Sequence, residues 1–269
     1  MSTQISIIIP CCNSEATLED TLKSVMDQDC HHWEVIIIND GSTDATEEIA
    51  LKWVDHDNRF RYFSKENEGL GKARNYGIER AKGIYILPLD SDNLVEKSFV
   101  AEAISVLESN EKIGVVHGHA EFFGEKKGNW YIKSFDLESI MVDNYIDACA
   151  IFRKETWCIV GGYDENMPYQ GFEDWEFWIA LGTHKVQFYH LDKVTFKYFV
   201  QSTSMVRSFT KEMAISNRDY IVKKHSKLYF DKYVEKYSEV ALHQKQLQSK
   251  KFILNNFTKR FLGFTFFKY

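Results

Sequence analysis

In the first ninety residues, short apolar runs alternate with segments in which apolar residues recur at helical spacing. Short runs rich in β-branched and aromatic residues, typical of buried strands, occupy residues 5–10, 35–38, 60–63 and 84–89. Between these runs apolar residues recur at helical spacing, first at Leu18, Leu22 and Val25. Strands that alternate with helices imply a parallel sheet with right-handed crossovers. We therefore predict an α/β fold, a single Rossmann-like domain with a mostly parallel central sheet.

The second half of the chain has a less regular pattern. It predicts a helix near 99–107, a strand at 113–117, a hairpin or long loop at 120–133, a strand at 144–153 and two short strands within 185–200. From about Met205 the sequence is charged and helical. The predicted organisation is one domain at 1–205 and a helical C-terminal extension at 206–269.

Composition narrows the class of protein. With 269 residues, 44% of them apolar and 27% charged, the chain is of ordinary globular type. A net charge of −6 leaves no basic excess with which to neutralise nucleic-acid phosphates. We find no apolar run of the ~18 residues that span a bilayer and no secretory signal. The five cysteines show no zinc spacing or disulfide framework, so we expect a reduced, cytoplasmic protein.

Two carboxylates follow the fourth predicted strand. The apolar run 84–89 leads directly into Asp90 and Asp92. In open α/β sheets, ligands bind outside the carboxyl ends of the strands. Magnesium is usually held there by one or two carboxylates together with substrate phosphates. The pair is therefore a candidate metal site, and a solvated loop is the alternative.

Six motifs in order over residues 4–205 resemble the inverting family 2 glycosyltransferases, which have the A-type (nucleotide-diphospho-sugar transferase) fold. They are Ser6–Asn13, Val35–Asp44, Asn67–Gly77, Asp90-Ser91-Asp92, Gly161–Glu165 and Glu173-Asp174. The resemblance implies fold and reaction class, but it does not identify the sugar.

On the donor side, the resemblance implies a nucleotide-diphospho-sugar site. Asp40 is expected to accept a hydrogen bond from the imide N–H of uracil or thymine, with Pro10 and Asn13 lining the same pocket. Asp92 is expected to bind a divalent metal, Mn²⁺ or Mg²⁺, directly. Asp90 would reach the waters of the metal or the ribose hydroxyls. For Asp40, a turn or capping role is the alternative.

Two basic residues in the glycine-rich segment are further donor-site candidates. Lys72 and Arg74 could contact the sugar or the diphosphate, and a solvated helix face is the alternative.

On the acceptor side, the resemblance makes Asp174 the general base that takes the proton of the attacking hydroxyl. Glu173 would orient Asp174 or bind the acceptor, and Trp175 could present its ring to a sugar. The alternatives are acids that only serve a helix N-terminus and a tryptophan that only fills the core.

The chain departs from the family pattern at two positions. Cys12 stands where the family usually has a tyrosine against the base, and Gln201 stands where many members have a histidine near the metal. An amide oxygen suits a hard cation, but whether Gln201 is a third ligand stays open.

The resulting hypothesis is metal-dependent, inverting transfer of a hexose from a UDP-sugar to a hydroxyl of a glycan or lipid-linked glycan. A dTDP-sugar is the second choice of donor. A sugar-1-phosphate nucleotidyltransferase and a non-catalytic nucleotide or glycan binder are the alternatives.

The C-terminal segment 250–269 differs from the rest of the chain, because it combines many aromatic residues with five basic residues and no acid. It suits an interfacial helix in anionic headgroups, which would place the protein at the inner face of the cell membrane. A helix docked on the domain or on a partner subunit of an oligomer fits equally.

Overall fold

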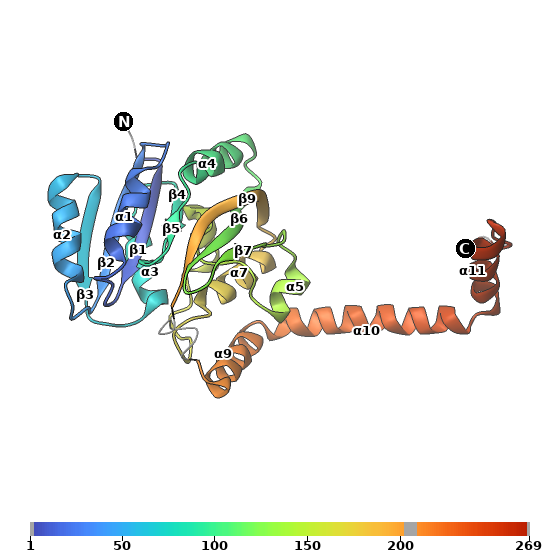
Figure 1. Cartoon of the computed structure of the whole chain (residues 1–269). Coiled ribbons are helices and arrows are strands. Elements are labelled where there is room, and N and C mark those ends of the chain that lie inside the picture. The colour runs from blue at the N-terminus through green and yellow to red at the C-terminus, as the bar shows by residue number, and fades with distance from the viewer. Residues whose placement is uncertain (1–2, 202–208, 268–269) are drawn as a thin grey trace. The chain divides into compact units, whose positions relative to one another are not determined.

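The computed structural model describes residues 3–201 and 209–267, which form two compact units, Met1–Ile221 and Val222–Tyr269 (Figure 1). The predicted boundary at 205/206 lies outside the described residues. Helix α9, which follows it, belongs for most of its length to the first unit.

The N-terminal half of the first unit alternates strands and helices as the sequence pattern predicts. Its elements are β1 (Ile5–Cys11), α1 (Leu18–Met26), β2 (Trp33–Asp40), α2 (Thr46–His56), β3 (Phe60–Lys65), α3 (Leu70–Glu79), β4 (Tyr85–Pro88), β5 (Leu94–Val95) and α4 (Phe99–Ser109). Strands β3, β2, β1 and β4 lie side by side in that order and are all parallel. Figure 1 shows the first three together in blue, beside α1 and α2.

The second half extends the same sheet with mixed pairing. Its elements are β6 (Ile113–Gly124), β7 (Gly128–Trp130), α5 (Leu137–Val142), β8 (Ile151–Arg153), α6 (Lys154–Val160), α7 (Glu173–Thr183), β9 (Gln187–Val200) and α9 (Lys211–Lys224). The sheet order is β3-β2-β1-β4-β8-β6-β9-β5, with β7 paired to β6. Strand β8 is antiparallel to both of its neighbours, whereas β6 and β9 are parallel. The α/β fold is confirmed, and its parallel part is the N-terminal half.

Helices cover both faces of the sheet. On one face, α1, α2 and α4 place Leu22, Ala50 and Phe99 in one core cluster with Ile7 and Ile9 of β1. On the other face lie α3, α6 and α7. The sheet is therefore the middle of three layers, as expected for alternating strands and helices.

Helix α3 approaches the sheet closely because one of its residues is a glycine. A Cβ atom built on Gly77 would lie 2.6 Å from Cγ2 of Ile8. This contact leaves room for no side chain, so the helix can lie directly against β1 and β2.

Three local expectations have definite outcomes. Of the two alternatives predicted for 120–133, a hairpin or a long loop, the hairpin is confirmed by the antiparallel pairing of β6 with β7. The strand predicted at 144–153 was too long, because only Ile151–Arg153 pair in the sheet. The two short strands predicted within 185–200 were wrong, since β9 is one strand whose pairing with β6 shifts between Leu191 and Val194.

The second unit contains α10 (Ser226–Gln248) and α11 (Lys250–Leu262), which contact each other. Asn255 of α11 is buried, and its side-chain oxygen accepts hydrogen bonds from the backbone N–H groups of Phe266 and Phe267 at 2.8 and 2.9 Å. These bonds fold the segment after α11 back onto the helix. Among the described residues, no helix has both the length and the apolar character needed to cross a membrane.

Candidate active site

The parallel strands β1, β2 and β4 end at the same edge of the sheet. The residues that continue from these ends, or form them, include Asn13, Asp40 and Asp90. Polar side chains separated by up to 77 positions in the sequence thus follow neighbouring strands. This is the edge at which open α/β sheets bind ligands.

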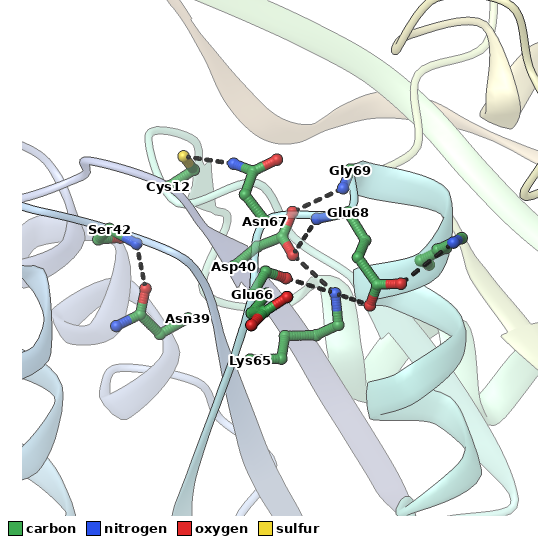
Figure 2. A network of polar contacts seen from close by, with 10 residues as sticks. Cys12, Asn39, Asp40, Ser42, Lys65, Glu66, Asn67, Glu68 and Gly69 are labelled. Carbon is green, nitrogen blue, oxygen red and sulfur yellow. Dashed lines mark hydrogen bonds and ion pairs between the residues drawn. The ribbon is translucent and has the colours of Figure 1, made fainter.

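The carboxylate of Asp40 is buried in a network of polar contacts (Figure 2). It accepts hydrogen bonds from the backbone N–H groups of Glu68 (3.0 Å) and Gly69 (2.8 Å). Nζ of Lys65 lies 2.8 Å from its Oδ1. Asp40 therefore fixes the start of α3. The base of a nucleotide could donate a hydrogen bond only to the carboxylate lone pairs that remain. Its predicted contact with uracil stays a prediction.

The residues after β1 are joined to the turn after β2. Asn13 has a φ of 53°, and its Oδ1 accepts a hydrogen bond from the backbone N–H of Thr43 at 2.8 Å. Pro10 is buried in β1 opposite Ile38. The thiol of Cys12 is exposed and accepts a hydrogen bond from the Asn67 amide at 3.2 Å (Figure 2).

Arg74 is buried, with 2% of its side chain exposed. Its guanidinium donates to Oδ1 of Asp90 at 2.7 Å and to the carboxylate of Glu173. Burial opposes the charged form, but these two acids outweigh it and raise the pKa of Arg74. The alternative of a solvated face is wrong for Arg74, which links the carboxyl end of β4 to the start of α7.

Lys72 differs from Arg74 although both belong to α3. Its Nζ lies 3.1 Å from Oε1 of Glu68, and both side chains are more than one-third exposed. The structure therefore places Lys72 on a solvated face, in a surface ion pair.

Asp92 lies two residues beyond Asp90 in the loop between β4 and β5. Burial and the neighbouring Asp90 charge raise the pKa of Asp92 to about 7. A carboxylate whose ionised form is disfavoured by an adjacent carboxylate is stabilised by a divalent cation that the two share. The donor set therefore fits a hard cation that completes its coordination with phosphate oxygens and water.

Within the described part of the chain, no three His, Cys, Asp or Glu side chains form a group that could hold a metal. Gln201 directly follows β9 and is partly buried. Its assignment as a third ligand stays a prediction.

A cavity of about 280 Å³ opens between the carboxyl end of β4 and the start of α7. Its lining includes Asp90, Arg74 and the acid pair Glu173 and Asp174. Asp92 and Gln201 are not among the residues that line it. Five of the predicted site residues, Trp175 among them, thus share one cavity, although they come from separate segments of the sequence. Pro10, Asn13, Asp40 and Lys72 do not line it.

Asp174 sits in the first turn of α7 and is only partly exposed. Its Oδ1 accepts a hydrogen bond from the backbone N–H of Trp175 at 2.7 Å. Its Oδ2 accepts a hydrogen bond from Nδ2 of Asn144 at 3.1 Å. Burial and the nearby Glu173 raise the pKa of Asp174 to about 7, against the opposing charge of Arg74. A carboxylate of this kind has the proton affinity of a general base near neutral pH.

Trp175 is almost fully buried, and its indole N–H donates to the carbonyl of Ile140. The guanidinium of Arg218 lies 4.8 Å from the centre of the Trp175 ring. Arg218 also donates to Oδ1 of Asp143 at 2.8 Å. Trp175 lines the cavity, but most of its ring serves packing.

Helix α9 holds the loop that precedes α7. Asn217 is fully buried, donates to the carbonyls of Tyr169 and Gly171 at 3.0 Å, and accepts from the Tyr169 N–H at 2.9 Å. The hydroxyl of Tyr220 donates to Asp164 at 3.1 Å. The walls of the cavity therefore depend on residues far beyond the six motifs.

Sequence reasoning missed four charged or amide-bearing residues that line this cavity, namely Asp143, Asn144, Asp147 and Arg218. Burial and the Asp90 charge raise the pKa of Asp147. For Asn144 and Asp147 a signal was available, since an amide and a carboxylate within four residues are unusual in a segment predicted to be a buried strand.

Comparisons with known proteins agree with this architecture. Residues 6–162 match the sequence profile of Glycosyl transferase family 2. Glycosyltransferase GlyG of Streptococcus pneumoniae is 33% identical over 152 residues, which cover 55% of this chain and 50% of that protein. Glycosyltransferase GlyA of the same organism is 35% identical over 129 residues, which cover 48% of this chain and 18% of that protein. The chain thus spans half or less of the length of these relatives.

A solved structure has the same fold. The crystal structure of Staphylococcus aureus TarS 1–349 in complex with UDP-GlcNAc matches with a TM-score of 0.66 and 20% identity, over 79% of this chain and 66% of that chain. The complex of the same protein with UDP matches with a TM-score of 0.63 and 22% identity, over 74% of this chain and 61% of that chain. The family profile covers more than half of the sequence, and the predicted A-type fold is confirmed. The chain belongs to glycosyl transferase family 2.

Proposed function

We propose that this protein transfers a hexose, with inversion, from a UDP-sugar to a hydroxyl of a glycan or lipid-linked glycan. The observation that carries the proposal is that Asp90 and Asp174 line the same cavity. Asp90 follows the strand at which a nucleotide diphosphate would bind, and Asp174 lies in the first turn of α7, on another wall of the cavity. A sugar between them would have its leaving group on one side and a proton acceptor on the other.

The donor half of the proposal rests on the strand ends. Asp40 would accept from the imide N–H of the base, beside Pro10 and Asn13. TarS was crystallised with UDP and with UDP-GlcNAc, which supports uridine as the nucleotide here. Thymidine presents the same imide, so a dTDP-sugar is the second choice.

Asp92 and Asp90 would hold Mn²⁺ or Mg²⁺, with Gln201 as a further candidate oxygen ligand. When bound, the cation would neutralise charge on the departing diphosphate. Arg74 keeps Asp90 in place through its 2.7 Å hydrogen bond. Because Arg74 already pairs with two acids, its role here is to position Asp90 and Glu173.

On the acceptor side, Asp174 would take the proton of the attacking hydroxyl. The acceptor oxygen then bonds to the anomeric carbon while the bond from that carbon to the diphosphate breaks on the opposite face. General base catalysis of this kind typically contributes ~10²–10⁴-fold to the rate. Within the acid pair, Glu173 is held by Arg74, which leaves Asp174 as the member available for proton transfer.

The test compares donor binding with turnover. UDP affinity is measured by calorimetry with and without Mn²⁺, and UDP release is measured with a panel of UDP-sugars and candidate acceptors. Asp174→Asn should keep the UDP affinity and lose ~10²-fold or more in UDP release. The matched control, Asp143→Asn, changes an acid that pairs with Arg218 at the cavity. Near-normal turnover of Asp174→Asn would contradict the base assignment.

The C-terminal segment would attach the protein to the inner face of the cell membrane. Phe257, Phe261 and Phe266 are 56%, 66% and 60% exposed, and the basic residues of 250–269 have no acid among them. Such a surface suits anionic headgroups. The full chain should sediment with phosphatidylglycerol vesicles, and a chain without 250–269 should not. If the full chain stays in the supernatant, docking on another protein surface is the better explanation.

A further inference from the structure

The candidate base has a second polar partner that no sequence motif contains. Nδ2 of Asn144 lies 3.1 Å from Oδ2 of Asp174, across thirty positions of sequence. Asn144 belongs to the segment between α5 and β8 and lines the same cavity. The bond therefore joins two separate walls of the site.

The orientation of the Asn144 amide follows from its two neighbours. Its Oδ1 accepts a hydrogen bond from the backbone N–H of Ile146 at 3.3 Å. Its NH₂ group faces the carboxylate of Asp174. If the amide were turned over, two oxygens would face each other, and an NH₂ group would face an N–H.

We propose that Asn144 is a positioning residue for Asp174, which fixes the carboxylate so that one oxygen stays directed at the acceptor hydroxyl. This inference rests on the proposed function. The backbone N–H of Trp175 holds the other oxygen at 2.7 Å, so together the two donors fix the plane of the carboxylate. A carboxylate held in this way needs no reorientation before it accepts a proton.

The same bond favours the ionised form of Asp174. Burial and the Glu173 and Asp90 charges raise the pKa of Asp174, whereas the Arg74 charge and the Trp175 N–H lower it. A donor aimed at a carboxylate stabilises its charge, so the Asn144 amide should act in the same direction as Arg74 and Trp175. Without Asn144, Asp174 should remain protonated to higher pH. The fraction of enzyme with a competent base would then fall at neutral pH.

Asn144→Asp is the sharpest variant, because it keeps the shape and the oxygen that accepts from Ile146. It replaces the NH₂ donor with a carboxylate oxygen, which places a like charge beside Asp174. Asn144→Ala removes the donor without adding charge. Asn110→Asp is the matched control, since the Oδ1 of Asn110 accepts from the backbone N–H of Lys112 at 3.0 Å at the end of α4. An aspartate can do the same there.

Two readouts separate this inference from the proposed function. The first is the pKa of Asp174 from ¹³C-carboxyl NMR, assigned with Asp174→Asn, which needs no substrate. We expect a rise of about one unit in Asn144→Ala and a larger rise in Asn144→Asp. The second is the pH profile of UDP release, whose acid limb should move up by the same amount while the UDP affinity stays unchanged.

An Asp174 pKa that is the same in wild type and in both Asn144 variants would overturn the inference, even if the enzyme is a glycosyltransferase. The same holds if Asn110→Asp shifts the profile as much as Asn144→Asp. If Asp174→Asn retains turnover, the proposed base is wrong, and the NMR result still decides whether Asn144 controls this carboxylate.

Discussion

Replacing Arg74 with methionine should destabilise the first unit strongly. The change removes a guanidinium that is 2% exposed and leaves Glu173, whose side chain is 5% exposed, without its partner. Removing one member of a buried ion pair typically costs about 3–5 kcal/mol, because the remaining charge is left in a poorly solvated place. Asp90 is 31% exposed, so water can solvate its unpaired charge, and it contributes less to the loss of stability than Glu173 does.

The expected loss corresponds to a fall in Tm of about 10 °C for a unit of this size. Lys72→Met is the matched control on the same helix. Lys72 pairs with Glu68 at the surface, where a pair contributes at most about 1 kcal/mol. Thermal unfolding of both variants, followed by circular dichroism, gives the comparison directly.

A second variant isolates the cause of the loss. Arg74→Met combined with Glu173→Gln removes the stranded charge, so it should be more stable than Arg74→Met alone. If Arg74→Met and Lys72→Met have the same Tm, or if the Glu173 change restores nothing, the buried ion pair does not hold α3 to α7.

Three further predictions follow from other parts of the structure. Burial, with help from His190 and His119, lowers the pKa of His117 to about 3. Protons bind preferentially to the unfolded chain between pH 6.5 and that value, so the free energy of unfolding should fall by about 2 kcal/mol from pH 7 to pH 5. Denaturant melts at both pH values should show a smaller fall in His117→Phe. The raised pKa of Asp92 means that protons would compete with a metal bound there, so on the proposed function the Mn²⁺-dependent gain in UDP affinity should increase from pH 6 to pH 8 and vanish in Asp92→Asn. Calorimetry that finds an equal gain at both pH values would contradict this. Asn217→Ala removes three buried hydrogen bonds to Tyr169 and Gly171 and should cost roughly 2–4 kcal/mol. Hydrogen exchange should speed up at 169–171, whereas exchange at β1 serves as the internal control.

The N-terminal half of the fold could be predicted because its strands are apolar and its helices amphipathic. Ile36 and Ile38 of β2 are buried, as the pattern requires, and parallel pairing follows from the intervening helices. Strand β9 was harder, since Asp192 and Lys193 interrupt its apolar pattern where the pairing with β6 shifts. A local irregularity of this kind looks like the end of a strand in the sequence alone.

The site could be predicted only where its residues follow strand ends or belong to motifs. Asp90 and Asp174 were found in this way, and both line the cavity. Asn144 was not, because hydrogen-bonded pairs between distant loops leave no periodic signal in one sequence. Arg74 and Lys72 had equal standing before the structure, and only the packing of α3 against α7 separates the buried cation from the solvated one.

The hydrogen bonds from α9 to the loop before α7 have a practical consequence for protein engineering. The family profile stops at residue 162, before the candidate base and well before Asn217. A fragment that ends with the profile, or at residue 205, would lack Asn217 and with it the hydrogen bonds that hold the loop before α7. The shortest fragment worth expressing for enzymology therefore runs to about Ile221, where the first unit ends.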